Sequence, residues 1–288
     1  MNTLLQTFRL QLLRYRQDPL SLAIWLLVSF AALSTVGILL LLVGYILVKG
    51  VPNIHPSLFA LEYNSENVSL LPALINTLMV ILLTLTIAGP LGVFSALYLS
   101  EYASRSNRFV QWIRLATETL AGIPSIIYGL FGMLFFVTFL HWGYSLLAGA
   151  CTLAIMILPL MMRATEEALH SVPDAYREGS YALGAGRLRT IFTIVLPAAM
   201  PGVLAGVILS IGRIVGESAA LIYTAGTASQ IANGLFSSGR TLSVHMYNIS
   251  NEGLYINQTY ATAVVLLLFV ALINWISNFV AGKLTKGS

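Results

Sequence analysis

Residues 21–48 have the sequence SLAIWLLVSFAALSTVGILLLLVGYILV and contain no Asp, Glu, Lys or Arg. A helix that crosses a bilayer needs about 20 mostly apolar residues, because lipid offers unpaired backbone groups no hydrogen-bond partner. This segment is therefore long enough to cross a membrane. It is too long for the core of a signal peptide and lacks a convincing small-residue cleavage site, so we expect it to be retained.

The whole chain has the composition of a polytopic membrane protein. Of its 288 residues, 57% are hydrophobic and 9% are charged, with a formal net charge of +4. Soluble domains contain about 25% charged residues, so the composition excludes a soluble enzyme, a disordered protein, a collagen-like fibre and a disulfide-rich secreted module. The single cysteine, Cys151, allows neither an intrachain disulfide nor a thiolate metal cage.

Long uncharged runs predict an all-α bundle of six transmembrane helices. Basic residues predict its orientation, because Lys and Arg gather in cytoplasmic loops. Only Lys49 and Arg240 flank one set of helix ends, so both termini are predicted to be cytoplasmic. The twelve basic residues at the other ends are Arg9, Arg14, Arg16, Arg105, Arg108, Arg114, Arg163, Arg177, Arg187, Arg189, Lys283 and Lys286. The expected segments are a basic tail at 1–20, spans at 21–48, 72–99, 117–140, 143–163, 197–223 and 256–280, and a cytoplasmic segment at 164–192.

The chain lacks the common catalytic motifs. A nucleotide-binding P-loop needs Gly-x-x-x-x-Gly-Lys-Ser/Thr, and none of the lysines, Lys49, Lys283 and Lys286, lies in that pattern. The sequence contains neither His-Glu-x-x-His nor Gly-x-Ser-x-Gly. We therefore expect no catalytic residue, no metal ligand, no bound cofactor and no nucleic-acid partner.

The longest charged stretch is RATEEALHSVPDAYREGSYALGAGRLRTIFTIVLP, residues 163–197, and it predicts a short helix outside the bilayer. Ser171 can cap a helix whose third residue is Asp174, and Pro173 is tolerated in the first turn. Gly184 is a natural stop. The helix would fit either a groove on a cytoplasmic partner or the lipid headgroups. Its apolar side would consist of Tyr176, Ala182 and Leu183.

The spacing of Glu178, Gly184, Ile194 and Leu196-Pro197 resembles the EAA loop of ABC-importer permeases, with Gly179-Ser180 in place of Ala-Ala. The resemblance implies the type I importer permease fold and a coupling helix that docks on a homodimeric P-loop ATPase. ATP and Mg²⁺ would then be bound by that ATPase. The residues implied in the coupling are Arg177, Glu178, Gly179, Ser180, Gly184 and Ala185.

Three further motifs resemble the PstA-type permeases of phosphate importers: IPSIIYGLFG (123–132), GRIVGESAALIYTAG (212–226) and LSVHMY (242–247). The resemblance covers about residues 72–278, the type-1 transmembrane domain. It implies transport of inorganic phosphate through a bacterial or archaeal cell membrane, together with a PstC-type permease and an extracytoplasmic phosphate-binding protein. The alternatives are an importer of sulfate or molybdate, a stand-alone secondary transporter and an integral membrane enzyme.

Arg213 and Glu217 lie inside the fifth predicted span. At 1.5 Å per residue from Pro201, they are roughly 18 Å and 24 Å along a helix. They are four residues apart, so they would share a helix face and could pair. One interpretation is a self-neutralising pair that locks helix packing. The other is a substrate pathway, in which the Arg213 guanidinium binds phosphate and Glu217 accepts the proton that phosphate carries.

The remaining charged and aromatic residues near the span ends are predicted to mark membrane boundaries. We expect an ion pair between Arg114 and Glu118 at the start of the third span. Glu101 would mark the end of the second span, and His141 and Trp142 would be external interface anchors.

Overall fold

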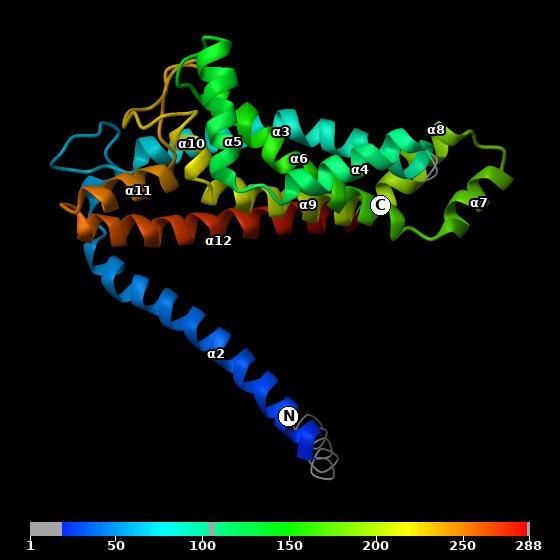
Figure 1. The fold of residues 1–288 in the computed structure, drawn as a ribbon, viewed down its shortest axis with the longest axis horizontal. Helices are drawn as coiled ribbons and strands as arrows, with labels where there is room; N and C mark the ends of the chain where they lie inside the picture. The colour runs from blue at the N-terminus through cyan, green and yellow to red at the C-terminus, as the bar shows by residue number, and fades with distance from the viewer. Residues whose placement is uncertain (1–18, 104–106, 287–288) are drawn as a thin grey trace.

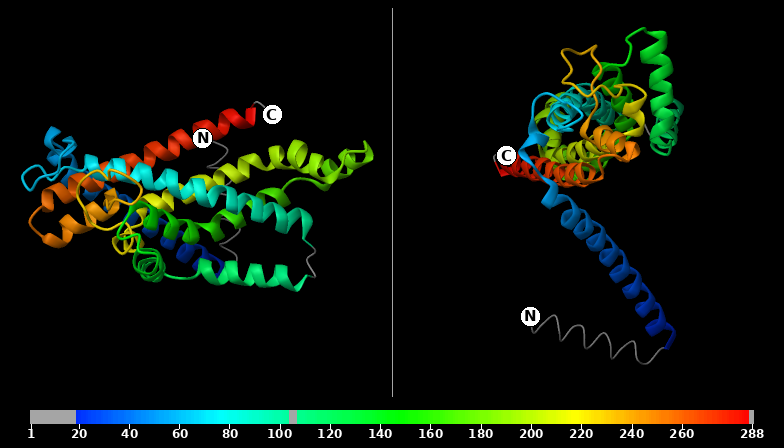
Figure 2. Two further views of the ribbon diagram at one scale, coloured as in Figure 1. Left: turned by 90° about the horizontal axis from the view of Figure 1, so that it is seen from above. Right: turned by 90° about the vertical axis from the view of Figure 1, so that its left-hand side faces the viewer.

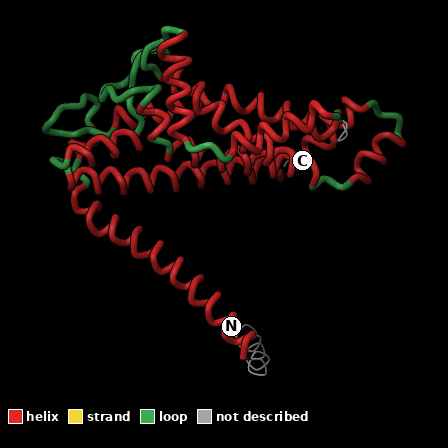
Figure 3. Tube along the Cα trace, viewed as in Figure 1, coloured by secondary structure: helices red, strands yellow, loops and turns green. Residues whose placement is uncertain are grey.

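The computed structural model describes residues 19–103 and 107–286; residues 1–18 of the predicted basic tail and Arg105 lie outside this part. All regular structure within it is helical, and the long helices other than the first run roughly along one axis (Figures 1 and 3). Five of these helices are long and apolar enough to cross a membrane, and a bent helix pair brings the number to six. The long helices are α2 (Pro19–Gly50), α3 (Leu71–Leu97), α6 (Leu146–His170), α9 (Leu196–Gly216) and α12 (Ile256–Lys286).

Helices α3, α6 and α9 form the centre of the bundle, where α6 packs against both of the others. Small residues allow α6 and α9 to approach closely, since a Cβ at Gly206 would lie 2.6 Å from the Cβ of Ala164. Because apolar side chains fill the space between these helices, the helix ends are held in fixed relative positions. The buried core includes Val80, Leu153, Met156, Ile157 and Ile214.

Helix α2 leaves the bundle at an angle (Figure 1, and Figure 2, right). It is attached through its C-terminal end, where the Tyr45 ring lies edge-on to the Tyr260 ring of α12 at 5.8 Å between centroids. The most apolar stretch of α2 is 0% buried. This arm therefore presents its apolar surface to lipid or to another chain.

The third predicted span, 117–140, is not a straight helix. The helix at Arg108–Ala121 and the helical run at Ser125–Phe139 meet at a bend of 103°, and the second of them stands across the bundle axis in Figure 1. Pro124 causes the break, because it lacks an N–H and disfavours helical backbone in the preceding residue. The Tyr128 hydroxyl donates to the Leu120 carbonyl oxygen at 2.8 Å across the bend. The elements are α4 (Arg108–Ala121), α5 (Ser125–Gly132) and the π-helix η4 (Met133–Phe139).

The segment between α6 and α9 contains more helix than the sequence predicts. Helix α6 continues to His170 instead of ending near residue 163, and the helical run that leads into α9 begins at Arg187. The predicted cytoplasmic segment 164–192 is therefore partly an extension of the two neighbouring spans. It contains α7 (Asp174–Ala182), α8 (Arg187–Thr190) and the π-helix η5 (Ile191–Val195), which leads into α9.

The two ends of the bundle carry different elements (Figure 2, left). The α7 end holds α7, α8 and the π-helix η3 (Tyr98–Tyr102), which extends α3. The α11 end holds α11 (Leu242–Glu252) and two short 3₁₀ helices, η1 (Val51–Asn53) and η2 (Pro56–Phe59). Helix α12 ends, and α2 begins, on the side away from α11 (Figure 1).

Candidate functional site

The predicted docking segment lies at the α7 end, but α7 starts differently from the prediction. Ser171 does not cap α7; it is the C-cap of α6, and its hydroxyl donates to the Ala168 carbonyl oxygen at 2.7 Å. The N-cap of α7 is Pro173, whose ring fixes φ near the helical value. Asp174 follows in the first turn, where a carboxylate is stabilised by the positive end of the helix dipole.

The end of α7 confirms Gly184 as the stop. Gly184 has φ +80°, a left-handed conformation that glycine adopts at little cost. Its N–H donates to the Tyr181 carbonyl oxygen at 2.9 Å, and the Ala185 N–H donates to the Ser180 carbonyl oxygen at 3.1 Å. These two bonds form a Schellman motif, which satisfies the last carbonyls of the helix. Gly184 and Ala185 therefore shape the end of α7.

The outward face of α7 is a surface of small, acidic and apolar side chains. Glu178 and Gly179 are exposed, and Leu183 is 91% exposed. Ser180 points inward instead, and its hydroxyl hydrogen-bonds that of Thr190 at 2.8 Å. Burial of an exposed leucine side chain against a protein partner is favourable, because it removes apolar surface from water. We call Glu178, Gly179 and Leu183 the outward face of α7.

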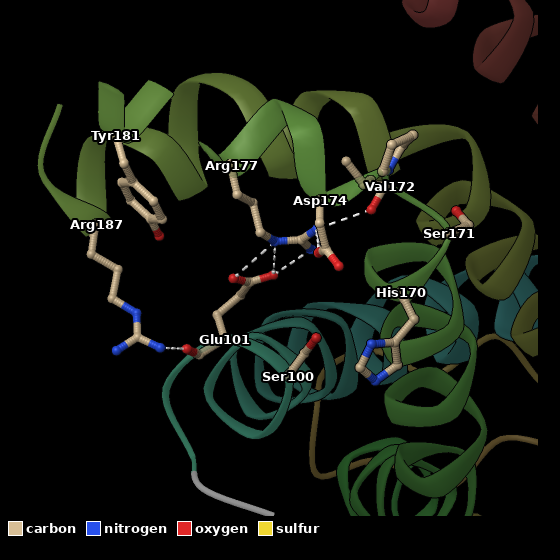
Figure 4. Close-up of a pocket in the computed structure, with 10 residues that line it drawn as sticks. Ser100, Glu101, His170, Ser171, Val172, Asp174, Arg177, Tyr181 and Arg187 are labelled. Atoms are coloured by element: carbon tan, nitrogen blue, oxygen red, sulfur yellow. Dashed lines mark hydrogen bonds and ion pairs between the residues drawn. The ribbon is translucent and has the colours of Figure 1, made fainter. Parts of the chain in front are cut away.

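Arg177 also points inward, toward Glu101 of η3 (Figure 4). Its Nη2 lies 2.7 Å from Glu101 Oε1, and its Nε lies 3.2 Å from the same oxygen. The two side chains are 15% and 6% exposed. The neighbouring carboxylate of Glu101 is the main reason why the pKa of the Arg177 guanidinium is raised above its ordinary value. Glu101 is thus an ion-pair partner at the base of α7, beyond its predicted role as a boundary marker.

Arg187 holds the same end of α3 from another direction. Its Nη2 donates to the Glu101 carbonyl oxygen, and its guanidinium lies 4.7 Å from the centre of the Tyr102 ring. A polar cavity of about 630 Å³ lies beside these contacts, lined by Ser100, His170, Ser171, Tyr181 and others (Figure 4). Sequence reasoning missed Glu101 and Arg187 as a cluster, because they are 86 residues apart.

The structure separates Arg213 from Glu217. Helix α9 ends at Gly216, and Glu217 has extended backbone with φ −75° and ψ 128°, so the two side chains do not share a helix face. Glu217 Oε1 instead accepts from the N–H of Ala220, at the start of the short helix α10 (Ala219–Ile222), at 3.1 Å. Within the described residues Arg213 has no ion-pair partner, and its side chain is exposed.

The predicted Arg114–Glu118 pair is wrong. Arg114 lies 3.8 Å from Glu166, and Arg163 lies 3.5 Å from Glu118. Both pairs join α4 to α6, because α4 lies along α6 and brings partners from the second helix within reach. At these distances and exposures each pair contributes at most about 1 kcal/mol to stability.

A buried cluster at the α11 end was not predicted. Arg240 is 4% exposed, with its guanidinium 4.4 Å from the centre of the Tyr63 ring. His245 is 0% exposed, and neither ring nitrogen has a hydrogen-bond partner among the described residues. Burial and the nearby Arg240 charge lower the pKa of His245 to about 3. His245 lies in a stretch of mixed polar and apolar residues, so its sequence context gives no signal of such burial.

Within the described ranges, no three His, Cys, Asp or Glu side chains gather in a way that could hold a metal ion. The charged groups described above are joined instead as ion pairs, cation–π contacts and backbone caps. Their arrangement offers binding and helix positioning.

Comparison with known proteins gives one family and several relatives. Residues 88–286 match the family described as binding-protein-dependent transport system inner membrane component. The chain is 33% identical over 276 residues to the probable ABC transporter permease protein YqgI of Bacillus subtilis, covering 86% of this chain and 92% of that protein. It is 32% identical over 269 residues to the phosphate transport system permease protein PstA 2 of Mycobacterium bovis, covering 89% and 88%.

The fold also has a solved counterpart. A chain of a bacterial ABC transporter involved in the import of the acidic polysaccharide alginate superposes with a TM-score of 0.67. The superposition covers 94% of this chain and 98% of the other, at 17% sequence identity. At that identity the likeness concerns the arrangement of the helices.

Proposed function

The chain belongs to the binding-protein-dependent transport system inner membrane components, and from this membership we propose that it imports inorganic phosphate into the cytoplasm as one subunit of an ATP-driven transporter. It is a multi-pass membrane protein with the fold of an ABC importer permease. Its relative in Mycobacterium bovis is named as a phosphate transport permease. The observation that carries the phosphate proposal is Arg213, an exposed cation without an ion-pair partner in the described chain.

In the proposed complex the α7 end faces the cytoplasm and both termini lie there. Two copies of a P-loop ATPase bind ATP and Mg²⁺, while this chain binds neither. The outward face of α7 docks on one ATPase copy; the 91% exposure of Leu183 supports this, because such a side chain gains from burial against a partner. A PstC-type permease completes the membrane part, and an extracytoplasmic phosphate-binding protein delivers substrate at the α11 end.

The proposed mechanism joins ATP-driven movement of α7 to the substrate path. Helix α7 packs against α8 and η5, which lead directly into α9, and α9 carries Arg213 in its last turn. A guanidinium offers a planar fork of donors that matches phosphate oxygens. A cation at membrane depth is costly without a counter-charge, so a phosphate that passes Arg213 is stabilised there, and the negative end of α9 helps to hold the cation in place.

Glu217 is proposed to contribute to anion selectivity. As a carboxylate it can accept a hydrogen bond from a proton on phosphate, whereas fully ionised sulfate offers no proton. Its position at the break between α9 and α10 supports this role, since the backbone at Glu217 is extended and not helical. We expect Glu217→Gln to lessen discrimination against sulfate in a competition assay. Unchanged competition by sulfate would remove Glu217 from the selectivity proposal.

Phosphate uptake by proteoliposomes that contain the whole complex tests the proposed function. Wild-type complex is expected to import phosphate only when ATP is supplied on the α7 side. Arg213→Lys keeps the charge but lacks the fork, so we expect uptake about tenfold lower, equivalent to losing one charge-assisted hydrogen bond. Uptake without the ATPase, or no ATP-dependent phosphate uptake by the wild type, would contradict the proposal.

A further inference from the structure

The base of α7 contains a bridge that the docking function does not by itself require. Arg177 binds the Glu101 carboxylate in a fork: Nη2 reaches Oε1 at 2.7 Å, and Nε lies 3.2 Å from Oε1 and 3.4 Å from Oε2. Glu101 belongs to η3, the extension of α3. One pair of side chains thus connects the helix proposed to meet the ATPase with a central helix of the bundle.

The same guanidinium reaches a third helix. Arg177 Nη2 donates to the Leu169 carbonyl oxygen at 3.0 Å, and Nη1 donates to the Val172 carbonyl oxygen at 2.9 Å. Leu169 lies in the last turn of α6, where carbonyls lack helical partners. Arg177 therefore ties α7 to both α3 and α6, and these two helices pack against each other along the core.

The space around this bridge is hollow. The cavity of about 630 Å³ is lined by residues of η3, of the α6 end and of α7 (Figure 4). A void transmits no force, because its walls do not touch. A displacement of α7 toward or away from α3 at this place acts directly on the Arg177–Glu101 contact that spans it.

We propose that the Arg177–Glu101 ion pair is the positioning link through which movement of α7 reaches α3. This inference rests on the proposed function, because it assumes that an ATPase moves α7. The pair is suited to the task because it is nearly buried: the side chains are 15% and 6% exposed, so water and salt screen the attraction little. Its forked geometry also fixes direction, so α7 and α3 move together instead of sliding.

The chain supplies a matched control on the same guanidinium. Arg177 Nη1 also lies 3.1 Å from Asp174, whose side chain is 87% exposed. That contact joins two residues of α7 and spans no gap between helices. An exposed pair of this kind contributes little, so Asp174→Asn removes an Arg177 ion pair without removing the link.

The test is the number of ATP molecules hydrolysed per phosphate imported, measured in proteoliposomes that contain the whole complex. Glu101→Gln keeps the size and the acceptor oxygen but removes the charge. We expect it to assemble and to raise the ratio about tenfold, within the usual range of coupling between sites. Asp174→Asn is expected to keep the wild-type ratio. Glu101→Gln combined with Arg177→Gln is expected to be no worse than Arg177→Gln alone, since Arg177→Gln already removes the pair with Glu101.

A wild-type ratio in assembled Glu101→Gln complex would overturn the link and leave the phosphate importer intact. Failure of the wild-type complex to import phosphate would overturn the proposed function, whatever the variants do. If Glu101→Gln does not assemble, Arg177→Gln serves instead, because it removes the positive charge that pairs with Glu101. An unchanged ratio in assembled Arg177→Gln complex would equally overturn the link.

Discussion

Arg177 lies on the docking helix α7 and Arg213 on α9, which follows it in the chain, yet the protein surrounds the two guanidinium groups in opposite ways. Arg177 is directed into the protein and contacts two carboxylates and two backbone carbonyls. Arg213 is exposed and has no ion-pair partner within the described residues. An arginine whose guanidinium donors are engaged within the chain fixes helices relative to one another. An arginine at membrane depth that lacks an ion-pair partner has guanidinium donors available for a ligand from outside the chain.

The largest effect expected from this contrast is that of Arg213→Ala. Loss of a forked, charge-assisted contact costs about 3 kcal/mol in all, so phosphate uptake should fall about 100-fold. Assembly and ATP binding should remain normal, because Arg213 makes no ion pair that holds the described fold together. Uptake by reconstituted complex and co-purification of the subunits measure the two expectations.

Arg108→Ala is the matched control for this change. Arg108 is exposed at the start of α4, and its removal takes away one positive charge far from the proposed path. We expect uptake close to that of the wild type. If assembled Arg213→Ala complex transported as fast as the control, Arg213 would have no place in the substrate path.

The second prediction concerns the outward face of α7, the counterpart of the inward-facing Arg177. Glu178→Lys reverses a charge at the proposed ATPase contact, and removal of a central interface residue costs about 2 kcal/mol, or about 30-fold. We expect uptake to fall by this factor while ATP hydrolysis continues. Glu167→Lys, at an exposed position near the end of α6, is the control. Full uptake by Glu178→Lys complex would argue against docking through this face.

The sequence predicts the helices well where a long uncharged run is the only feature needed. Residues 21–48 and 256–280 lie within α2 and α12, because a long uncharged run in a bilayer has few alternatives to a helix. The size of the bend at Pro124, 103°, and the helix end at Gly216 were not predicted. Proline and glycine are tolerated inside straight membrane helices as well, since neighbouring helices can satisfy the freed backbone groups.

The partners of the charged residues were predicted less well. Neighbours along one helix can be read from spacing, so Arg213 with Glu217 and Arg114 with Glu118 were natural pairs. The helix stops between the first two, and α6 supplies closer partners to the second two. Arg177 and Glu101 are 76 residues apart, so their contact depends on how whole helices pack, which no local pattern contains.

His245 adds a third case to the comparison of Arg177 and Arg213: a basic side chain that is buried without a hydrogen-bond partner in the described chain and stays uncharged. Its pKa is lowered to about 3, below the ordinary value of about 6.5. The unfolded chain therefore binds a proton that the folded chain does not between these values. The contribution of neutral His245 to the free energy of unfolding should be fully present above about pH 6.5. The free energy of unfolding should then fall by about 1.4 kcal/mol per pH unit as the pH drops toward 3.

Unfolding of the purified protein between pH 4 and pH 7 tests this slope. The His245→Gln variant has no titrating group at this position. The slope of its free energy of unfolding against pH should therefore be smaller by the value for one proton, about 1.4 kcal/mol per pH unit. The His141→Gln variant changes an exposed histidine and should keep the wild-type slope. Equal slopes for wild type and His245→Gln would mean that His245 is not buried in its neutral form.

The smallest expected effects are changes in the stability of α7 caused by alanine substitutions at two glycines of the docking segment. Gly179 has room for a Cβ, with no atom within 4 Å of that position, so Gly179→Ala should stabilise α7 by up to about 1 kcal/mol through helix propensity. Gly184 has equal room but φ +80°, so Gly184→Ala should destabilise the helix end by about 1 kcal/mol. Hydrogen exchange of the α7 amides would report both changes. Opposite signs at two equally open positions would show that backbone conformation, and not space, sets the end of the docking helix; equal signs would contradict the Schellman cap at Gly184.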